Sequence, residues 1–416
     1  MQVGMAENFT MMFSQSIGIE EPWYIDRAGF EENVREVHVY VRAREAAQYA
    51  CPECGVMSER YDNEDEERAW RHGDVVFYPC YVHCRRPRVK CRKHGIHVVT
   101  APWARKNSRF TLLFEAYAML LVADMPVLKS CQVLRCGYKS VTGIMRYWVE
   151  KAVAEVRLEE VTELNMDETS FERGQSYVTV VIDGEKRRVI DVEEGRGKEA
   201  VEAFSYKLEA KGGDCNKVVS VTSDMSKAYL AAVDDYFPEA VSVIDKFHVK
   251  KLVLDAQEKV RREEQRLRPH VRGNGKKLLM IPQSRLDDEQ RIAVESLSKV
   301  YPKTGRAYRM VQALDVVYES LNPTQAEERL ALLIRWMRRS RLTPMKNAAA
   351  TLKEHGPRIL AYFHNRLTNA VAEGINSMIQ AAKRKARGFR TFEGFACMIY
   401  LIAGKLKLSC GSPFSA

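Results

Sequence analysis

Between residues 162 and 244 the sequence alternates between strand-like and helix-like segments, and this order restricts the possible fold more than any other feature. Three β-rich segments come first, and Gly184 lies in the short link between the second and third, which favours a hairpin. The segments, in order, are strands at 162–166, 177–182 and 187–192, a helix at 198–210, a strand at 217–222, a helix at 227–236 and a strand at 240–244. This order predicts a mixed α/β sheet.

The same order is that of a ribonuclease-H-like core, although other mixed α/β domains share parts of it. Residues 247–365 are charged, mostly helical and without a strand pattern, which indicates an insertion. The helical pattern resumes at 365–386, and an apolar closing helix is expected at 392–408 after a basic turn. The sequence therefore predicts a mixed sheet that is split by a helical insertion.

The N-terminal part has a different pattern. Residues 1–34 are expected to form a lightly structured arm, and 36–42 alternate so that their valines share one face of a strand. Cys51-Pro-Glu-Cys54 follows, and a second alternating stretch, 74–90, leads to Cys91-Arg-Lys-His94. Two such turns joined by short strands predict a zinc ribbon with a Cys₃His site. Cys80 and Cys84 could compete as ligands, but their spacing is looser.

Residues 110–154 read as helical. Apolar residues recur at helical spacing in the first part, namely Phe110, Leu113, Phe114, Tyr117, Leu120 and Leu121. A break at 124–126, a short segment at 127–134, a turn at 136–138 and a helix at 139–150 predict a helix-turn-helix. The candidate DNA contacts are Lys139, Ser140, Thr142, Arg146 and Tyr147. The alternative is a helical pair with a purely structural role.

The net positive charge of the chain favours a polyanionic binding partner. The 416 residues carry a formal net charge of +10, and the pI is about 9.0, which suits nucleic acid or an anionic membrane surface. No signal peptide is visible, and the most apolar run, 116–122, is far shorter than the roughly 20 residues that span a bilayer. We therefore expect a soluble, intracellular protein with no membrane partner, whose ten cysteines bind metal or are buried rather than paired in disulfides.

Three acidic residues fall where a ribonuclease-H-like core would use them. Asp167 is expected to end the first strand and Asp224 the fourth, and Glu373 lies on a late helix. Mg²⁺ takes oxygen ligands, and two such ions can serve phosphodiester displacement. Two of these residues have a simpler interpretation: Asp224 could cap a helix near Ser226, and Glu373 could be a solvated side chain. At the first position the ligand could be Glu168 instead of Asp167, because only one of the two neighbours can face the site.

The neighbours of these residues favour a surface that faces phosphates. Asn369, Asn376 and Gln380 lie at helical steps from Glu373, and a basic cluster follows, with Lys383, Arg384, Lys385, Arg387 and Arg390. Basic residues at a helix end also complement its dipole, so the cluster has a structural alternative. Asp245 and His248 follow the fifth strand as auxiliary groups beside the site, as DNA contacts, or as a cap.

These segments together resemble a known family. The sequences MDETS, SDMSKAY, FPEAVSVIDKFHV and NAVAEGINSMIQAAKRKARGFRTFEGF are similar to the successive motifs of bacterial insertion-sequence transposases of the ISL3 family, and the resemblance covers essentially the whole chain. It implies a ribonuclease-H fold, a helical insertion before the final glutamate, and a DDE triad of Asp167, Asp224 and Glu373. Asp245 is the runner-up for the second position. Relatives usually have Cys-x-x-Cys at both turns, whereas the second here ends in His94.

The resulting expectation is a multidomain α+β and α/β protein. Its parts are an arm and strand at 1–50, a zinc ribbon at 51–105, a helix-turn-helix at 106–156, the first catalytic part at 160–250, the helical insertion at 251–360 and the final catalytic helices at 361–408. We expect a bacterial, nucleoid-associated DNA transposase.

Its expected partners are double-stranded DNA, as terminal inverted repeats and target, and further copies of itself. Its expected cofactors are two Mg²⁺ or Mn²⁺ ions and a structural Zn²⁺. The alternatives are a catalytically silent DNA-binding regulator and a nuclease without strand transfer.

Overall fold

A computed structural model describes residues 11, 14–15, 17–170, 177–267, 275–365 and 370–409. The chain divides into two compact units, one formed by the residues up to Ala154 with those from Leu406 onward, the other by Glu155–Lys405. None of the described helices is long and apolar enough to cross a membrane.

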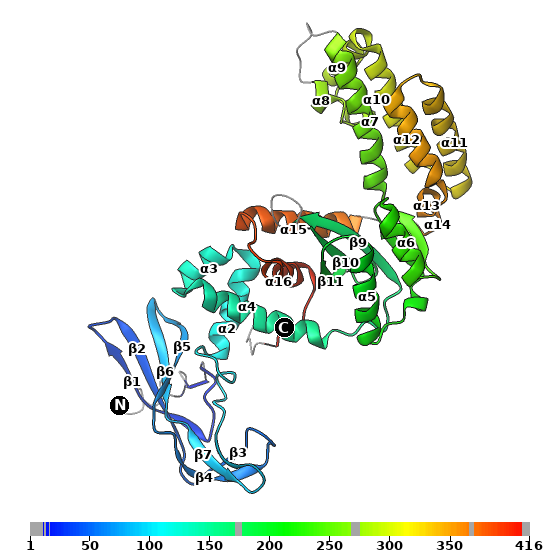
Figure 1. Cartoon of the computed structure of the whole chain (residues 1–416). Coiled ribbons are helices and arrows are strands. Elements are labelled where there is room, and N and C mark those ends of the chain that lie inside the picture. The colour runs from blue at the N-terminus through cyan, green and yellow to red at the C-terminus, as the bar shows by residue number, and fades with distance from the viewer. Residues whose placement is uncertain are drawn as a thin grey trace. The chain divides into compact units, whose positions relative to one another are not determined.

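Unit 1 begins with two four-stranded sheets (Figure 1). The first sheet has the order β1-β2-β6-β5, with β1 at Trp23–Glu31, β2 at Glu36–Ala43, β5 at Arg68–Val75 and β6 at Tyr78–Cys84. The second has the order β3-β4-β7-β8, with β3 at Gln48–Ala50, β4 at Met57–Asn63, β7 at Pro87–Cys91 and β8 at Gly95–Val98. Val39 and Val41 are buried in β2 as their alternation predicts. Apolar residues from both sheets, including Val82 and Val89, share one core with Trp70 and Trp103.

Two expectations about this region were wrong. The N-terminal arm contains a nine-residue strand, β1, which pairs antiparallel with β2 along its length. The stretch 74–90 is not one strand, because β5 and β6 form a hairpin that turns at Val76 and Phe77. Hairpin turns usually contain Gly, Asn or Asp. This turn contains two apolar residues instead, so the hairpin could not be recognised from the sequence.

Three helices complete unit 1: α2 at Leu112–Asp124, α3 at Val127–Leu134 and α4 at Tyr138–Glu155. Thr111 caps α2 by accepting from the backbone N–H of Phe114. The α3–α4 turn passes through Arg135 in the left-handed region (φ 52°). The buried face of α2 differs from the apolar face that the sequence predicts. Tyr117 and Leu120 were expected on the apolar face but are 44% and 52% exposed, whereas Glu115 is fully buried.

Unit 2 contains a five-stranded sheet of order β11-β10-β9-β12-β13. Its elements are β9 at Glu163–Ser170, β10 at Tyr177–Asp183, β11 at Arg188–Glu194, α5 at Lys198–Ala210, a 3₁₀ turn at Cys215–Lys217, β12 at Ser220–Ser223, α6 at Lys227–Tyr236 and β13 at Val241–Ile244. The first three strands pair antiparallel, and β12 pairs parallel with β9 and β13. This is the predicted ribonuclease-H-like order.

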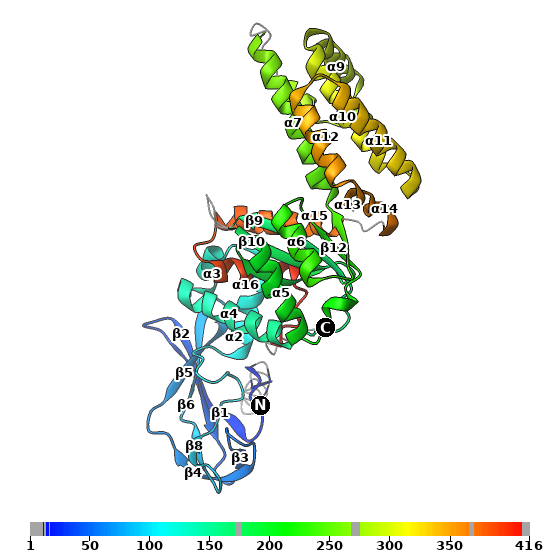
Figure 2. The same cartoon turned by 45° about the vertical axis from the view of Figure 1, so that its right-hand side comes forward.

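Helices cover both faces of this sheet (Figure 2). On one face, Leu164 and Met166 of β9 pack with α5 and α6. On the other, alternate residues of β10, such as Val178 and Val180, pack with α15 at Ala370–Ala386 and α16 at Phe392–Ala403. Because neighbouring residues of a strand point to opposite faces, Asp167 faces the α15 side and Glu168 the α5–α6 side.

The predicted insertion is a helical bundle that follows β13. It contains α7 at Lys246–Leu267, α8 at Gly275–Leu278, a 3₁₀ turn at Gln283–Arg285, α9 at Asp288–Val300, α10 at Pro302–Tyr318, α11 at Pro323–Arg339, α12 at Thr343–Glu354, α13 at Gly356–Leu360 and α14 at Tyr362–Asn365. Helices α7, α10, α11 and α12 pack in a closed ring of four, seen side by side in Figures 1 and 2. Their apolar core is continuous with Ile244 of β13 and Leu230 of α6.

Three boundaries in unit 2 differ from those expected. β9 continues to Ser170, so Asp167 lies inside the strand rather than at its end. Pairing of Ser170 with Tyr177 of β10 extends the strand through residues whose polar character had indicated a loop. β12 begins at Ser220, later than expected, and α16 ends at Ala403, five residues before the predicted end.

Candidate active site and metal centre

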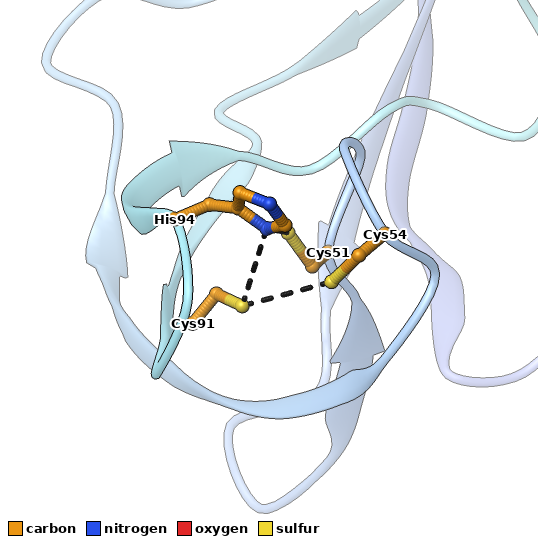
Figure 3. A group of neighbouring side chains, drawn as sticks. All are labelled: Cys51, Cys54, Cys91 and His94. Carbon is orange, nitrogen blue, oxygen red and sulfur yellow. Dashed lines mark hydrogen bonds between the residues drawn. The ribbon is translucent and has the colours of Figure 1, made fainter.

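Four side chains of the second sheet in unit 1 converge on one point (Figure 3). Cys51 and Cys54 come from the β3–β4 turn, and Cys91 and His94 from the β7–β8 turn. The Cys54 and Cys91 sulfurs are 3.7 Å apart, and His94 Nδ1 is 3.7 Å from Cys91 Sγ and 3.8 Å from Cys51 Sγ. Zn–S bonds of about 2.3 Å at tetrahedral angles place sulfurs about 3.8 Å apart, so this donor set fits one zinc ion.

The pKa shifts distinguish Cys51 and Cys91, whose pKa values are lowered, from Cys80 and Cys84. Backbone N–H groups of Lys93 and His94 lower the pKa of Cys91 to about 6, which favours the thiolate that zinc needs. Burial instead raises the pKa of Cys80 and of Cys84 to about 12. Both are buried in β6 of the other sheet, so neither competes for the ion.

Helix α4 presents its polar side to solvent. Lys139 and Arg146 are exposed, whereas Ile144 and Trp148 are buried on the opposite side. The Thr142 hydroxyl donates to the backbone oxygen of Tyr138 at 2.8 Å. This arrangement leaves the first three turns of α4 with accessible cations, where a recognition helix contacts base edges and phosphates.

In unit 2, three aspartates lie at one level of adjacent parallel strands. Thr222 pairs with Asn165, and Ser223 pairs with Ile244. Extending this register places Asp224 beside Asp167 and Asp245 beside Asp224, and the Asp245 N–H continues the ladder by donating to Ser223 O at 3.0 Å. All three therefore lie at the same edge of the sheet, Asp167 within β9 and the other two directly after β12 and β13. Strand spacing of about 4.8 Å makes Asp224 the nearer neighbour of Asp167.

The Asp167 carboxylate has partners from three elements. Its Oδ1 accepts the backbone N–H of Glu168 at 2.8 Å and lies 3.5 Å from His248 Nε2, and its Oδ2 accepts from the Asn376 amide of α15. Burial works to lower the pKa of His248, but the hydrogen bond to Asp167 and the charges of Asp245, Asp167 and Asp224 raise it overall. The site therefore holds several negative charges around one imidazole.

The carboxyl of Glu168, on the other face of the sheet, is affected by the charges of the same aspartates. Burial raises the pKa of its carboxyl, and the charges of Asp224 and Asp167 raise it further, against the opposing effect of Arg196. A carboxyl whose ionisation is opposed by burial and by neighbouring negative charges is a poorer cation ligand. Glu168 also faces away from α15, the helix that carries Glu373, so Asp167 is the better candidate ligand.

Helix α15 makes a row of polar side-chain contacts with β9. Besides the Asn376–Asp167 contact, the Gln380 amide donates to Thr169 Oγ1 at 2.8 Å, and Lys383 Nζ is 3.1 Å from Ser170 Oγ. Glu373 is exposed and lies one helical turn before Asn376. The row fixes which side of α15 faces Asp167.

The zinc-type ligands are the only group of three or more Cys, His, Asp or Glu ligand atoms within 4.8 Å of one another in the described parts of the chain. The carboxylates of Asp167, Asp224 and Glu373 are therefore spaced more widely than the ligands of a single ion. Ligands of two ions that are about 4 Å apart need not approach one another so closely.

Comparison with protein families identifies the chain. Residues 164–399 match a transposase family, ISL3, whose members carry a DDE domain. The chain belongs to the ISL3 family of transposases. Residues 99–149 match the helix-turn-helix domain of the same family, and residues 47–94 match the zinc finger of the IS204/IS1001/IS1096/IS1165 transposases. The zinc site and the DNA-binding helices thus belong to a catalytic DDE transposase.

Relatives extend over nearly the full length of the transposase. The transposase for insertion sequence element IS1557 of Mycobacterium tuberculosis is 25% identical over 423 residues, covering 94% of each chain. The transposase for insertion sequence element IS1001 of Bordetella parapertussis is 24% identical over 391 residues, covering 92% of this chain and 95% of the relative.

The remaining candidate residues of the transposase have varied surroundings. Asn369 lies outside the described residues. Asp245 Oδ1 accepts the Phe247 N–H at 2.7 Å, and its Oδ2 is 3.9 Å from His248 Nε2. Asp224 Oδ1 accepts the Ser226 N–H at 2.7 Å, which forms a turn before α6, but Asp224 does not cap the helix, because Ser226 is the N-cap residue and no side-chain cap bond is present. In the basic cluster, Lys383 contacts β9, whereas Arg384, Arg387 and Arg390 are exposed.

Sequence reasoning missed Arg196 and Glu115. Arg196 follows β11, stacks on Tyr177 at 4.5 Å from the ring centroid and acts on Glu168. Its position between Gly195 and Gly197, directly after a predicted strand, was the available signal. Glu115 accepts from Arg105, Ser108 and the Trp148 indole and so joins α2 to α4. No local pattern distinguishes a buried glutamate of this kind.

Proposed function

We propose that this transposase recognises the terminal inverted repeats of its mobile element through unit 1 and cleaves and transfers DNA strands at Asp167, Asp224 and Glu373. The observation that supports this most directly is the juxtaposition of the register-matched Asp167 and Asp224 with α15, whose Asn376 touches Asp167 one turn from Glu373. Carboxylates from two strands and a helix offer the oxygen donors that hard divalent cations prefer.

In this proposal the three carboxylates hold two Mg²⁺ or Mn²⁺ ions. Such ions, when bound, activate the attacking oxygen and stabilise the leaving oxygen of a phosphodiester displacement. Asp167 is central, because it lies between the Asp224 strand and the Glu373 helix. Asn376 and His248 orient its two oxygens, and Asp245 in turn lies beside His248.

Basic side chains are proposed to position the DNA. Arg384, Arg387 and Arg390 follow the Glu373 helix and are exposed, which suits contacts to phosphates near the scissile bond. Lys139, Ser140, Thr142 and Arg146 of α4 are proposed to contact the repeat. Because an element has two ends and each site acts on one, the active complex is proposed to contain at least two copies of the chain.

Alanine substitution of the triad tests the proposal. Asp167→Ala, Asp224→Ala and Glu373→Ala should each abolish Mg²⁺-dependent cleavage of a duplex that carries the element end, while affinity for that duplex stays within about twofold. Glu393→Ala removes an exposed carboxylate from the start of α16 and should leave cleavage intact. Cleavage retained in any triad variant would refute the assignment of that residue.

Two further results distinguish the alternatives. If Asp245→Ala abolishes cleavage and Asp224→Ala does not, Asp245 is the second carboxylate. With added target DNA, the wild-type protein should yield a joined product. Binding without cleavage would instead indicate a silent regulator, and cleavage without joining would indicate a nuclease.

A further inference from the structure

The end of α11 and the start of α12 form a concentrated positive region. Between Arg329 and Lys353 the sequence contains seven cations and no Asp or Glu. The cations are Arg329, Arg335, Arg338, Arg339, Arg341, Lys346 and Lys353. Such a segment cannot neutralise its own charge through local ion pairs.

Six of these cations are exposed, and five of them, all except Lys353, lie around the turn between α11 and α12. Arg335, Arg338, Arg339, Arg341 and Lys346 are exposed, and none forms an ion pair with a carboxylate of the described chain. Elsewhere in the same bundle several cations are paired: Arg261 and Arg262 with Glu258, Arg291 with Asp288, and Lys250 with Asp315. This end of the bundle is distinguished by a run of unpaired cations with no acidic residue among them.

An aromatic side chain lies among the cations. Trp336 is 39% exposed, and Leu332, one turn earlier, is 60% exposed. With Arg335 and Arg339 they form one stripe at helical spacing on the outer side of α11, opposite the buried Leu333 and Met337. Cations interleaved with an exposed aromatic ring are typical of nucleic-acid surfaces.

This region lies at the end of the bundle remote from the sheet. Arg306, near the start of α10, donates to Ser340 O at 3.1 Å, whereas α10 ends beside Tyr362 and α13 contacts β13. The 17 residues of α11 extend about 25 Å at 1.5 Å per residue. The cations therefore lie well away from the three aspartates.

Helix electrostatics alone do not explain the arrangement. Cations in the last turn of α11 complement its dipole, but Arg341 and Lys346 lie at the start of α12, where the dipole disfavours positive charge. Arg341 also occupies the left-handed region (φ 60°). The exposed Trp336 ring is uncharged, so it neither compensates a helix dipole nor increases solubility.

We propose that Arg335, Trp336, Arg338, Arg339, Arg341 and Lys346, here called the distal basic surface, bind the backbone of duplex DNA away from the scissile phosphate. The guanidinium groups contact phosphate oxygens, for which their fork geometry is suited, and the indole packs on the sugar–phosphate backbone. This inference rests on the proposed function, because it assigns a second contact to the same DNA substrate.

Salt dependence of binding tests the surface in the full-length protein. The probes are a 60-base-pair duplex with the element end and an unrelated duplex of equal length. Each lost phosphate contact lowers the slope of log K against log salt by about 0.9, so Arg335→Gln/Arg338→Gln/Arg339→Gln should reduce the slope on both duplexes by about 2 to 3. Trp336→Ala should weaken binding to both duplexes, and Trp336→Phe should restore most of it.

A control variant separates this effect from total charge. Arg262→Gln/Arg291→Gln/Lys299→Gln removes three exposed cations from α7 and α9 of the same bundle and should leave the slope unchanged. An unchanged slope in the α11 variant would overturn the inference, and loss of oligomeric mass without a slope change would show that this surface binds another copy instead. Failure of the wild-type protein to cleave would refute the proposed function while leaving a measured slope difference intact.

Discussion

At the scale of single residues, His72 makes unit 1 sensitive to acid. Its Nδ1 is 2.9 Å from the Thr111 hydroxyl, which caps α2. Burial, aided by the charge of Arg71, lowers the pKa of His72 from 6.5 to about 4. Between these two pH values the unfolded chain binds a proton that the folded chain does not, so the free energy of unfolding falls as the pH decreases.

We expect His72→Gln to remove part of this dependence. At about 1.4 kcal/mol per pKa unit, the His72 contribution changes by about 3 kcal/mol between pH 7 and pH 4. Denaturant unfolding followed by tryptophan fluorescence should show the wild-type protein losing more stability than His72→Gln over this range. Zinc loss in acid affects both proteins, so the difference isolates His72. Parallel pH profiles would contradict the assignment.

At the scale of elements, the zinc turns should be separable from the other sheet. We expect one zinc ion per chain in the wild-type protein and none in Cys91→Ala, measured by metal analysis of the purified protein. Cys80→Ala, in the buried β6, should keep the full zinc content, and His94→Cys should keep it as well, because four thiolates also form a tetrahedral site. If Cys80→Ala lost zinc and Cys91→Ala kept it, the assignment of Cys91 as a zinc ligand would be wrong.

The elements also show what the sequence could and could not predict. The alternation of β2, the strand order of unit 2 and the zinc ligand spacing follow from local patterns and were predicted. The polar stripe of Asn376 and Gln380 was visible, but its contacts with Asp167 and Thr169, more than 200 residues earlier, depend on tertiary packing. The same holds for Glu115, whose burial requires Arg105 and Trp148 at once. Polar residues that pair across strands similarly concealed the true end of β9.

At the scale of the whole molecule, the apolar core of the insertion extends to the edge of the catalytic sheet at β13 and α6. Leu230 and Ile244 on the sheet side cluster with Val249 of α7, Ile359 of α13 and Phe363 of α14, and this cluster continues through the bundle. A bundle attached only by its two chain connections would have a separate core. A shared core implies that displacement of the bundle is coupled to β13, whose carboxyl end leads to Asp245.

We therefore expect unit 2 to unfold in one cooperative transition and unit 1 in another. Calorimetry should show that zinc removal shifts only the unit 1 transition, because the ion binds the folded ribbon. Ile359→Ala, at a fully buried position, should destabilise unit 2 by about 2–5 kcal/mol and lower its Tm without moving the unit 1 transition. A bundle transition separate from that of the sheet would contradict the shared core, because the apolar contacts between Ile359 and β13 would then contribute nothing to cooperativity.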